Sequence, residues 1–115
     1  MPYPFWIKDL GTRGEYLARR WYHRLGYHLV GRNIRIRQGE IDLIMARRNR
    51  VLFVEVKTRS GFTHKIADVL SKDQERRLIR LAEAYMSVHP DIHWAFFLTL
   101  VQVKGRQYTM VHARL

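Results

Sequence analysis

The chain has 115 residues, of which 47% are hydrophobic, so we expect one domain over residues 1–115 with a single modest core. The absence of cysteine excludes a disulfide framework and thiolate zinc sites, and it favours a reducing, cytoplasmic location. No apolar run reaches membrane length, and a net charge of +11 is typical of a nucleic-acid binder.

The first predicted element is a helix over about residues 12–25. Thr12 and Glu15 have the spacing of a capping box, and Gly26 suits the position after a helix end. An apolar stripe at helical spacing lies between them. Its members are Leu17, Ala18, Trp21, Tyr22 and Leu25.

Strands dominate the middle of the chain. Residues there are β-branched or aliphatic and alternate with polar turns, and one polar loop has hairpin length. The predicted strands are at 27–35, with an interruption near Gly31, and at 40–46 and 51–58.

The last third of the chain predicts one helix and two strands. Ser71 and Gln74 form a second capping-box signal, and the helix that follows ends at His89 and Pro90. Strands are predicted at 94–103 and 107–112. The resulting order, α-β-β-β-α-β-β, indicates an α/β domain.

The predicted hairpin places two acids opposite each other. If Ala46 faces Val51, then Asp42 pairs with Glu55, with Cβ atoms about 4.5–5.5 Å apart on one face. Like charges so placed destabilise a sheet, and a divalent cation removes that cost. Two carboxylates suit Mg²⁺ or Mn²⁺, and the backbone carbonyl of Val56 can supply another oxygen ligand.

Lys57 lies two residues beyond Glu55 and projects from the same face. Its ammonium can hold an attacking water and neutralise charge that builds on a phosphate. The alternative is an exposed charged face on which Glu40 forms a cross-strand salt bridge with Lys57. Residues 51–58 are apolar on both faces, which is typical of a central strand, and buried charges favour a functional site.

Basic residues outnumber acids by twelve to four between Leu10 and Ser60. A surface that binds phosphate should avoid carboxylates, so the few acids that persist there have a specific task. For Lys72, a solvated position in the first helical turn is the alternative to a phosphate contact. The candidate nucleic-acid-binding residues are Arg13, Arg35, Arg37, Arg47, Arg48, Arg59 and Lys72.

Two motifs resemble a known family. Residues 39–44, Gly-Glu-Ile-Asp-Leu-Ile, and 53–59, Phe-Val-Glu-Val-Lys-Thr-Arg, resemble the paired signature of the YraN-like uncharacterised proteins. The resemblance covers about residues 11–100. That family is similar to the PD-(D/E)XK nucleases, which include archaeal-type Holliday junction resolvases. It therefore implies a restriction-endonuclease-like αβββαβ core with a mixed central sheet.

The resemblance also implies roles for individual residues. Asp42 and Glu55 match the metal carboxylates of the superfamily, and Lys57 matches its catalytic lysine. Glu15 is either a further acid of the site, as in resolvase-like relatives, or simply the capping-box residue. Many relatives work as dimers, so a homodimer is an expectation of the resemblance, although the sequence indicates no interface.

One position departs from the family pattern. The strand after the second predicted helix usually carries an acid, and Ala95 stands in its place. Nearby Trp94, Phe96 and Phe97, like Trp6 and Trp21, are expected in the core rather than as platforms for stacked bases.

Three functions therefore remain open. The first is a Mg²⁺-dependent endonuclease that hydrolyses phosphodiester bonds of DNA, including branched or single-stranded forms. The second, motivated by Ala95, is a catalytically inactive nucleic-acid-binding protein on a nuclease-like fold. The third is a basic interaction module without nucleic-acid specificity.

Overall fold

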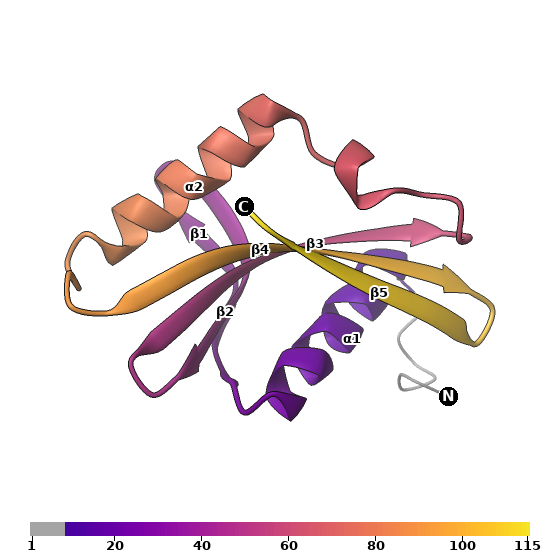
Figure 1. The fold of residues 1–115 in the computed structure, drawn as a ribbon, viewed down its shortest axis with the longest axis horizontal. Coiled ribbons are helices and arrows are strands. Elements are labelled where there is room, and N and C mark those ends of the chain that lie inside the picture. The colour runs from indigo at the N-terminus through magenta and orange to yellow at the C-terminus, as the bar shows by residue number, and fades with distance from the viewer. Residues whose placement is uncertain (1–8) are drawn as a thin grey trace.

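Two long helices and five strands make up residues 9–115, the part of the chain that the computed structural model describes. The strands form one sheet in the order β1-β2-β3-β4-β5, in which β3 and β4 are parallel and the other neighbours antiparallel (Figure 1). This confirms the predicted α/β class and element order and is consistent with a restriction-endonuclease-like core. Neither long helix is apolar and extended enough to cross a bilayer. The elements are α1 (Leu10–Arg24), β1 (His28–Ile36), β2 (Gly39–Arg47), β3 (Arg50–Ser60), the 3₁₀ turn η1 (Ile66–Asp68), α2 (Lys72–Met86), β4 (His93–Lys104) and β5 (Gln107–Arg114).

The hairpin between β2 and β3 has the register that the sequence predicts. Ala46 pairs with Val51, and the ladder continues to the pair of Leu43 and Val54, where it stops. The predicted direct pair of Asp42 with Glu55 is therefore not part of the ladder, because β2 and β3 separate at that point. The turn closes through Arg48, which has a positive φ of 56°. β3 is the middle strand of the sheet, as its apolar residues on both faces indicate.

Each long helix covers one face of the sheet (Figure 1). Residues of α1 and the segment after it pack against Leu43 and Val54, whereas residues of α2 pack against Ile44 and Phe53. We call these two sides the α1 face and the α2 face. Since successive strand residues point to opposite faces, the odd-numbered residues of β3 from Phe53 to Lys57 belong to the α2 face.

The alternation of faces along β2 is broken at Asp42. Leu43 and Met45 pack on the α1 face and Ile44 on the α2 face, as strict alternation requires. Ile41 should then join Leu43, but it packs with Ile44 on the α2 face instead. The backbone of β2 therefore changes course at Asp42, next to the last pair of the β2–β3 ladder.

The predicted start of α1 is wrong. The N-cap is Asp9, whose carboxylate accepts hydrogen bonds from the backbone N–H of Thr12 at 2.8 Å and from its hydroxyl at 2.9 Å. An Asp is as good an N-cap as a Thr, and here it adds almost one more turn to the helix. Glu15 is thus not the capping-box residue. The capping box predicted at Ser71 and Gln74 is present at the start of α2.

The apolar stripe of α1 does not pack as one surface. Leu17, Ala18 and Tyr22 are buried, but Trp21 and Leu25 expose 41% and 49% of their surface. The prediction that Trp21 is a core residue is therefore wrong, because its ring stacks on His112 of β5 and lines an open cavity instead of packing into the core. Of the other aromatic residues predicted in the core, Phe96 is buried, Trp94 and Phe97 are half-buried, and Trp6 is outside the described residues.

Gly14 allows α1 to approach β3 closely, and this contact gives a test of the packing. A Cβ at Gly14 would lie 1.7 Å from Thr58 Oγ1 and 2.8 Å from Thr58 Cβ. Helix propensity alone predicts that Gly14→Ala stabilises α1 by about 1 kcal/mol. We expect the opposite, a loss of about 1–3 kcal/mol in the free energy of unfolding, because the clash forces the helix away from the sheet.

The measurement is urea denaturation followed by circular dichroism, with Gly11→Ala as the matched control. A Cβ at the exposed Gly11 would meet only the Asp9 carboxylate, at 3.3 Å. Equal midpoints for the two variants would contradict the close approach of α1 to β3.

Candidate metal centre

Asp42 lies where β2 leaves β3. Its Oδ2 accepts a hydrogen bond of 2.8 Å from the backbone N–H of Val56, two residues beyond Val54, the last β3 residue of the ladder. The Asp42 carboxylate thus takes the place of the β2 backbone carbonyl that would otherwise accept the next hydrogen bond of the ladder. Because the N–H and C=O of one strand residue point to the same side, the Val56 carbonyl is also on the β2 side. The structure therefore brings the predicted oxygen donors of Asp42 and Val56 together.

Glu55 and Lys57 stand side by side on β3. Lys57 Nζ is 3.3 Å from Glu55 Oε2, and the two side chains are only 27% and 14% exposed. Glu55 also shares a side-chain hydrogen bond with Asp42. The cross-strand bridge between Glu40 and Lys57 that belongs to the alternative is not formed: Glu40 pairs with Arg35 at 3.6 Å, and Lys57 with Glu55. The alternative of an ordinary exposed charged face thus loses its main contact.

The two acids resist ionisation. Burial raises the pKa of Asp42, although the hydrogen bond from Val56 opposes this shift. Burial, followed by the charge of Asp42, raises the pKa of Glu55 to about 7. Lys57 lowers both values but does not cancel the effect of burial. The surroundings therefore disfavour the state in which both Asp42 and Glu55 are ionised, as expected for carboxylates whose charge Lys57 balances only in part.

The donor set fits a hard divalent cation. Two carboxyl groups within hydrogen-bond distance can share one ion, and ionised oxygens are the ligands that Mg²⁺ and Mn²⁺ prefer. Within residues 9–115, no three acidic or histidine side chains come together as a metal cluster. Any further ligands must then come from the Val56 carbonyl, water or substrate, which is usual for Mg²⁺.

Glu15 approaches the same centre from α1. Burial raises its pKa, and the charge of Asp42 is the next largest cause. It lines a small hollow with Arg32 and Leu43 on the α1 side of β2. Since Asp9 caps the helix, Glu15 is free of the structural role that the sequence suggested, and its carboxylate lies near enough to act on Asp42.

A hollow of about 200 Å³ opens beside Glu55 and Lys57, between the sheet and α2. The side chains of Gln74 and Arg77 line it from the helix. Sequence reasoning missed Arg77, which lies three residues after Gln74 and so shares its side of the helix. The three-residue spacing from Gln74 is the sequence signal that could have identified Arg77. Its guanidinium adds a cation close to the two acids.

The predicted phosphate-binding residues divide into two groups. Arg35, Arg37 and Arg59 belong to the end of the sheet that carries Glu55, and Arg13 lies in the first turn of α1 near the same end. Arg47 and Arg48 lie at the opposite end, about 17 Å from Asp42 by strand rise. Lys72 opens α2 and is paired with Glu75 at 3.3 Å, so it behaves as the first-turn surface residue of the alternative reading.

Ala95 is remote from the acids. In the parallel ladder it is level with Leu52, whereas Glu55 is level with Leu98. Ala95 also packs against the α1-face core, while Glu55 faces α2. The departure from the family pattern at Ala95 therefore leaves the centre of Asp42, Glu55 and Lys57 intact.

The fold and this site define an α/β domain with paired acids and a lysine on a splayed hairpin. The chain belongs to the uncharacterised protein family UPF0102, whose model matches residues 14–106, and this confirms the resemblance to YraN-like proteins. A UPF0102 protein of Synechococcus sp. is 36% identical over 94 residues, covering 80% of this chain and 72% of the relative. One from Clavibacter michiganensis is 42% identical over 86 residues, covering 73% and 72%. One from Chloroflexus aurantiacus is 38% identical over 89 residues, covering 77% and 71%.

The raised pKa of Glu55 predicts how metal-free stability depends on pH. A carboxyl group with a higher pKa in the folded chain holds its proton more tightly there. The stability it supports is therefore present at low pH and is lost as the pH rises from its usual 4.5 through about 7. We expect a loss on the order of 3 kcal/mol from this group in metal-free buffer.

Glu55→Gln should remove most of this pH dependence, because the amide cannot ionise yet can still hydrogen-bond to Asp42. The measurement is the free energy of unfolding in urea at pH 5 and pH 8 with chelator present. Glu83→Gln, on the outer surface of α2, is the control. Parallel profiles for wild type and Glu55→Gln would contradict the raised pKa.

Proposed function

We propose that the protein is a metal-dependent nuclease that hydrolyses phosphodiester bonds of DNA with Mg²⁺ or Mn²⁺. The observation that carries the proposal is the buried contact of Asp42 with Glu55, beside the ammonium of Lys57. Two buried acids held together on neighbouring interior strands destabilise the fold unless they have a ligand. The net charge of +11 supports a polyanionic substrate.

Each residue of the centre has a chemical role in this proposal. Asp42 and Glu55 hold the ion, with the Val56 carbonyl as a further donor, and Glu15 orients Asp42 from α1. When bound, the ion stabilises negative charge that develops on the phosphate. Lys57 positions the attacking water and offsets part of the same charge. Arg77, across the hollow from Lys57, holds a neighbouring phosphate of the strand.

The second candidate is a nucleic-acid-binding protein without catalysis. It was motivated by Ala95, but that residue lies on the opposite face from Glu55. The position of Ala95 therefore favours the nuclease over this candidate. Strongly salt-dependent binding with no cleavage of any substrate at any metal concentration would reverse that preference.

Loss of either Asp42 or Lys57 should abolish cleavage while binding is retained. We expect Asp42→Asn and Lys57→Ala each to lower the rate by about 100-fold or more, because each removes charge stabilisation that acts in the transition state. The assay titrates Mg²⁺ and Mn²⁺ against linear duplex, single-stranded and four-way-junction DNA. Gel mobility shifts measure binding of the same substrates.

Two exposed residues outside the site provide matched controls. Asp91→Asn changes an acid in the turn before β4, and Lys104→Ala changes a lysine at the end of β4. Both should cleave at the wild-type rate. Wild-type cleavage by Asp42→Asn or Lys57→Ala would overturn the assignment of the site.

Loss of the Glu15 carboxylate should weaken metal binding more than it lowers the stability of the fold. We expect Glu15→Gln to weaken Mn²⁺ binding by about 10- to 100-fold, as loss of a residue that orients a ligand usually does. Isothermal titration calorimetry measures this directly, and Glu83→Gln is the control. Unchanged affinity in Glu15→Gln would show that Glu15 has no part in the centre.

A further inference from the structure

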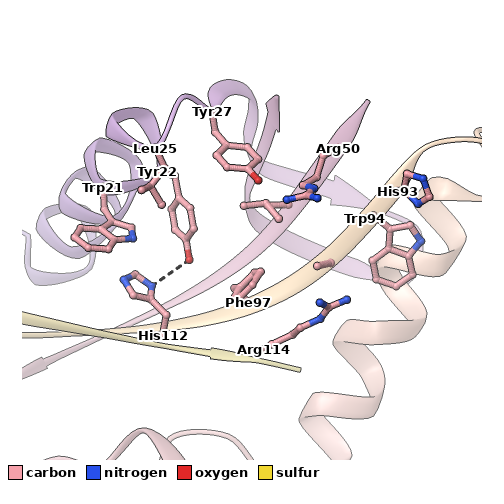
Figure 2. Close-up of a pocket in the computed structure, with 12 residues that line it drawn as sticks. Trp21, Tyr22, Leu25, Tyr27, Arg50, His93, Trp94, Phe97, His112 and Arg114 are labelled. Atoms are coloured by element: carbon pink, nitrogen blue, oxygen red, sulfur yellow. Dashed lines mark hydrogen bonds between the residues drawn. The ribbon is translucent and has the colours of Figure 1, made fainter. Parts of the chain in front are cut away.

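A second cavity lies on the α1 face, away from the metal centre. Its volume is about 640 Å³, which is within the range of sites that hold small organic molecules. It lies between the C-terminal end of α1 with the segment after it and the strands β3, β4 and β5, which supply the rest of its lining (Figure 2). We call it the α1 groove. The apolar and aromatic side chains that line it include Trp21, Tyr27, Leu52, Ala95 and Phe97.

Trp21 is held in place as a half-exposed aromatic surface. Its ring stacks on His112, with centroids 5.1 Å apart and planes inclined by 20°. His112 Nδ1 is in turn 2.8 Å from Thr99 Oγ1 and 3.1 Å from the Tyr22 hydroxyl. Figure 2 shows Trp21 beside His112, with Phe97 on the neighbouring strand. The ring is thus held by a partly buried network, yet 41% of its surface remains open.

The polar lining of the α1 groove is cationic. Arg50 and Arg114 both line it, and no Asp or Glu of the described part of the chain does. Arg50 is also paired across the hairpin with Arg47, an arrangement of like charges that costs stability. Among residues 9–115, none of these three arginines forms an ion pair with a carboxylate. The groove therefore has charge that suits an anion.

We infer that the α1 groove binds a nucleotide unit of single-stranded nucleic acid. The base stacks against Trp21 and Phe97, and the flanking phosphates contact Arg114 and Arg50. A fixed aromatic surface beside guanidinium groups is the usual arrangement for an unpaired base and its backbone. A duplex does not present an unstacked base. The choice of nucleic acid as the ligand rests on the proposed function, whereas the aromatic and cationic lining of the groove does not depend on it.

The α1 groove is separate from the metal centre. Arg50 and Glu55 are five residues apart on β3, or about 17 Å, and they point to opposite faces of the sheet. Binding in the groove can therefore be measured without cleavage. All binding experiments use the Asp42→Asn background with chelator present, so that failure of one proposal does not imply failure of the other.

The central experiment compares two 12-nucleotide strands, oligo-dT and an abasic strand of the same length, by fluorescence anisotropy. Trp21→Ala should weaken binding of oligo-dT by about tenfold and Trp21→Phe by much less, because base stacking is lost only in the first. Neither change should affect the abasic strand. Tyr108→Ala, an exposed aromatic residue near the other end of β5, is the control.

The arginines are tested through the salt dependence of binding. Arg114→Gln should lower the slope of log affinity against log salt by about 0.7, the value for one phosphate contact on a single strand. Arg106→Gln, in the exposed turn before β5, should leave the slope unchanged. Ala95→Asp should weaken binding by repelling phosphate, whereas the isosteric Ala95→Asn should have a smaller effect.

If Trp21→Ala does not fold, nuclear magnetic resonance on the protein with an unmutated groove tests the inference instead. Titration with a free mononucleotide should shift the indole N–H resonance of Trp21, assigned with Trp21→Phe. A shift with oligo-dT alone would restrict the ligand to the polymer and still support the groove. Unchanged oligo-dT affinity in Trp21→Ala, equal losses on the abasic strand, or no indole shift with either ligand would overturn the inference.

Discussion

The hydrogen bond from the Val56 N–H to Asp42 is the constraint from which the metal centre follows. β2 and β3 are paired up to Leu43 and Val54, and an ideal hairpin would continue the ladder from there. Because a side chain replaces the next backbone acceptor, the strands separate without leaving the Val56 N–H unpaired. The separation brings backbone and carboxylate oxygens of both strands to one place. Glu55 and Lys57, on the central strand, complete it.

The sequence contains enough information to predict this hairpin but not all of its surroundings. The pairing of Ala46 with Val51 follows from loop length, and that register places Asp42 near Glu55, although the ladder itself stops at Leu43 and Val54. The break in alternation at Asp42 depends on the packing of Ile41 against α2, which pattern reasoning does not see. The predicted start of α1 is wrong for a different reason. Asp9 and Thr12 are both good caps, and local propensity cannot choose between them.

The error at Trp21 is the most informative one. A stripe at helical spacing predicts which residues share a side of a helix, but not how far the opposing sheet extends. Leu17 and Trp21 lie on one side of α1, yet Leu17 packs into the core whereas Trp21 stacks on His112 beside an open cavity. The exposed end of the stripe is what lines the α1 groove. The prediction of phosphate-binding arginines was limited in the same way, since it counted arginines without separating those at the two ends of the hairpin.

β3 connects the two proposed sites, because its odd residues contribute to the metal centre and Arg50 and Leu52 to the α1 groove. The sites therefore open on opposite faces of a sheet that is covered by a helix on each side (Figure 1). A continuous duplex, which is stiff over about 150 base pairs, cannot bend around so small a domain to reach both. A single strand can, since its backbone is flexible. If both sites bind one molecule, its geometry selects DNA with an unpaired segment.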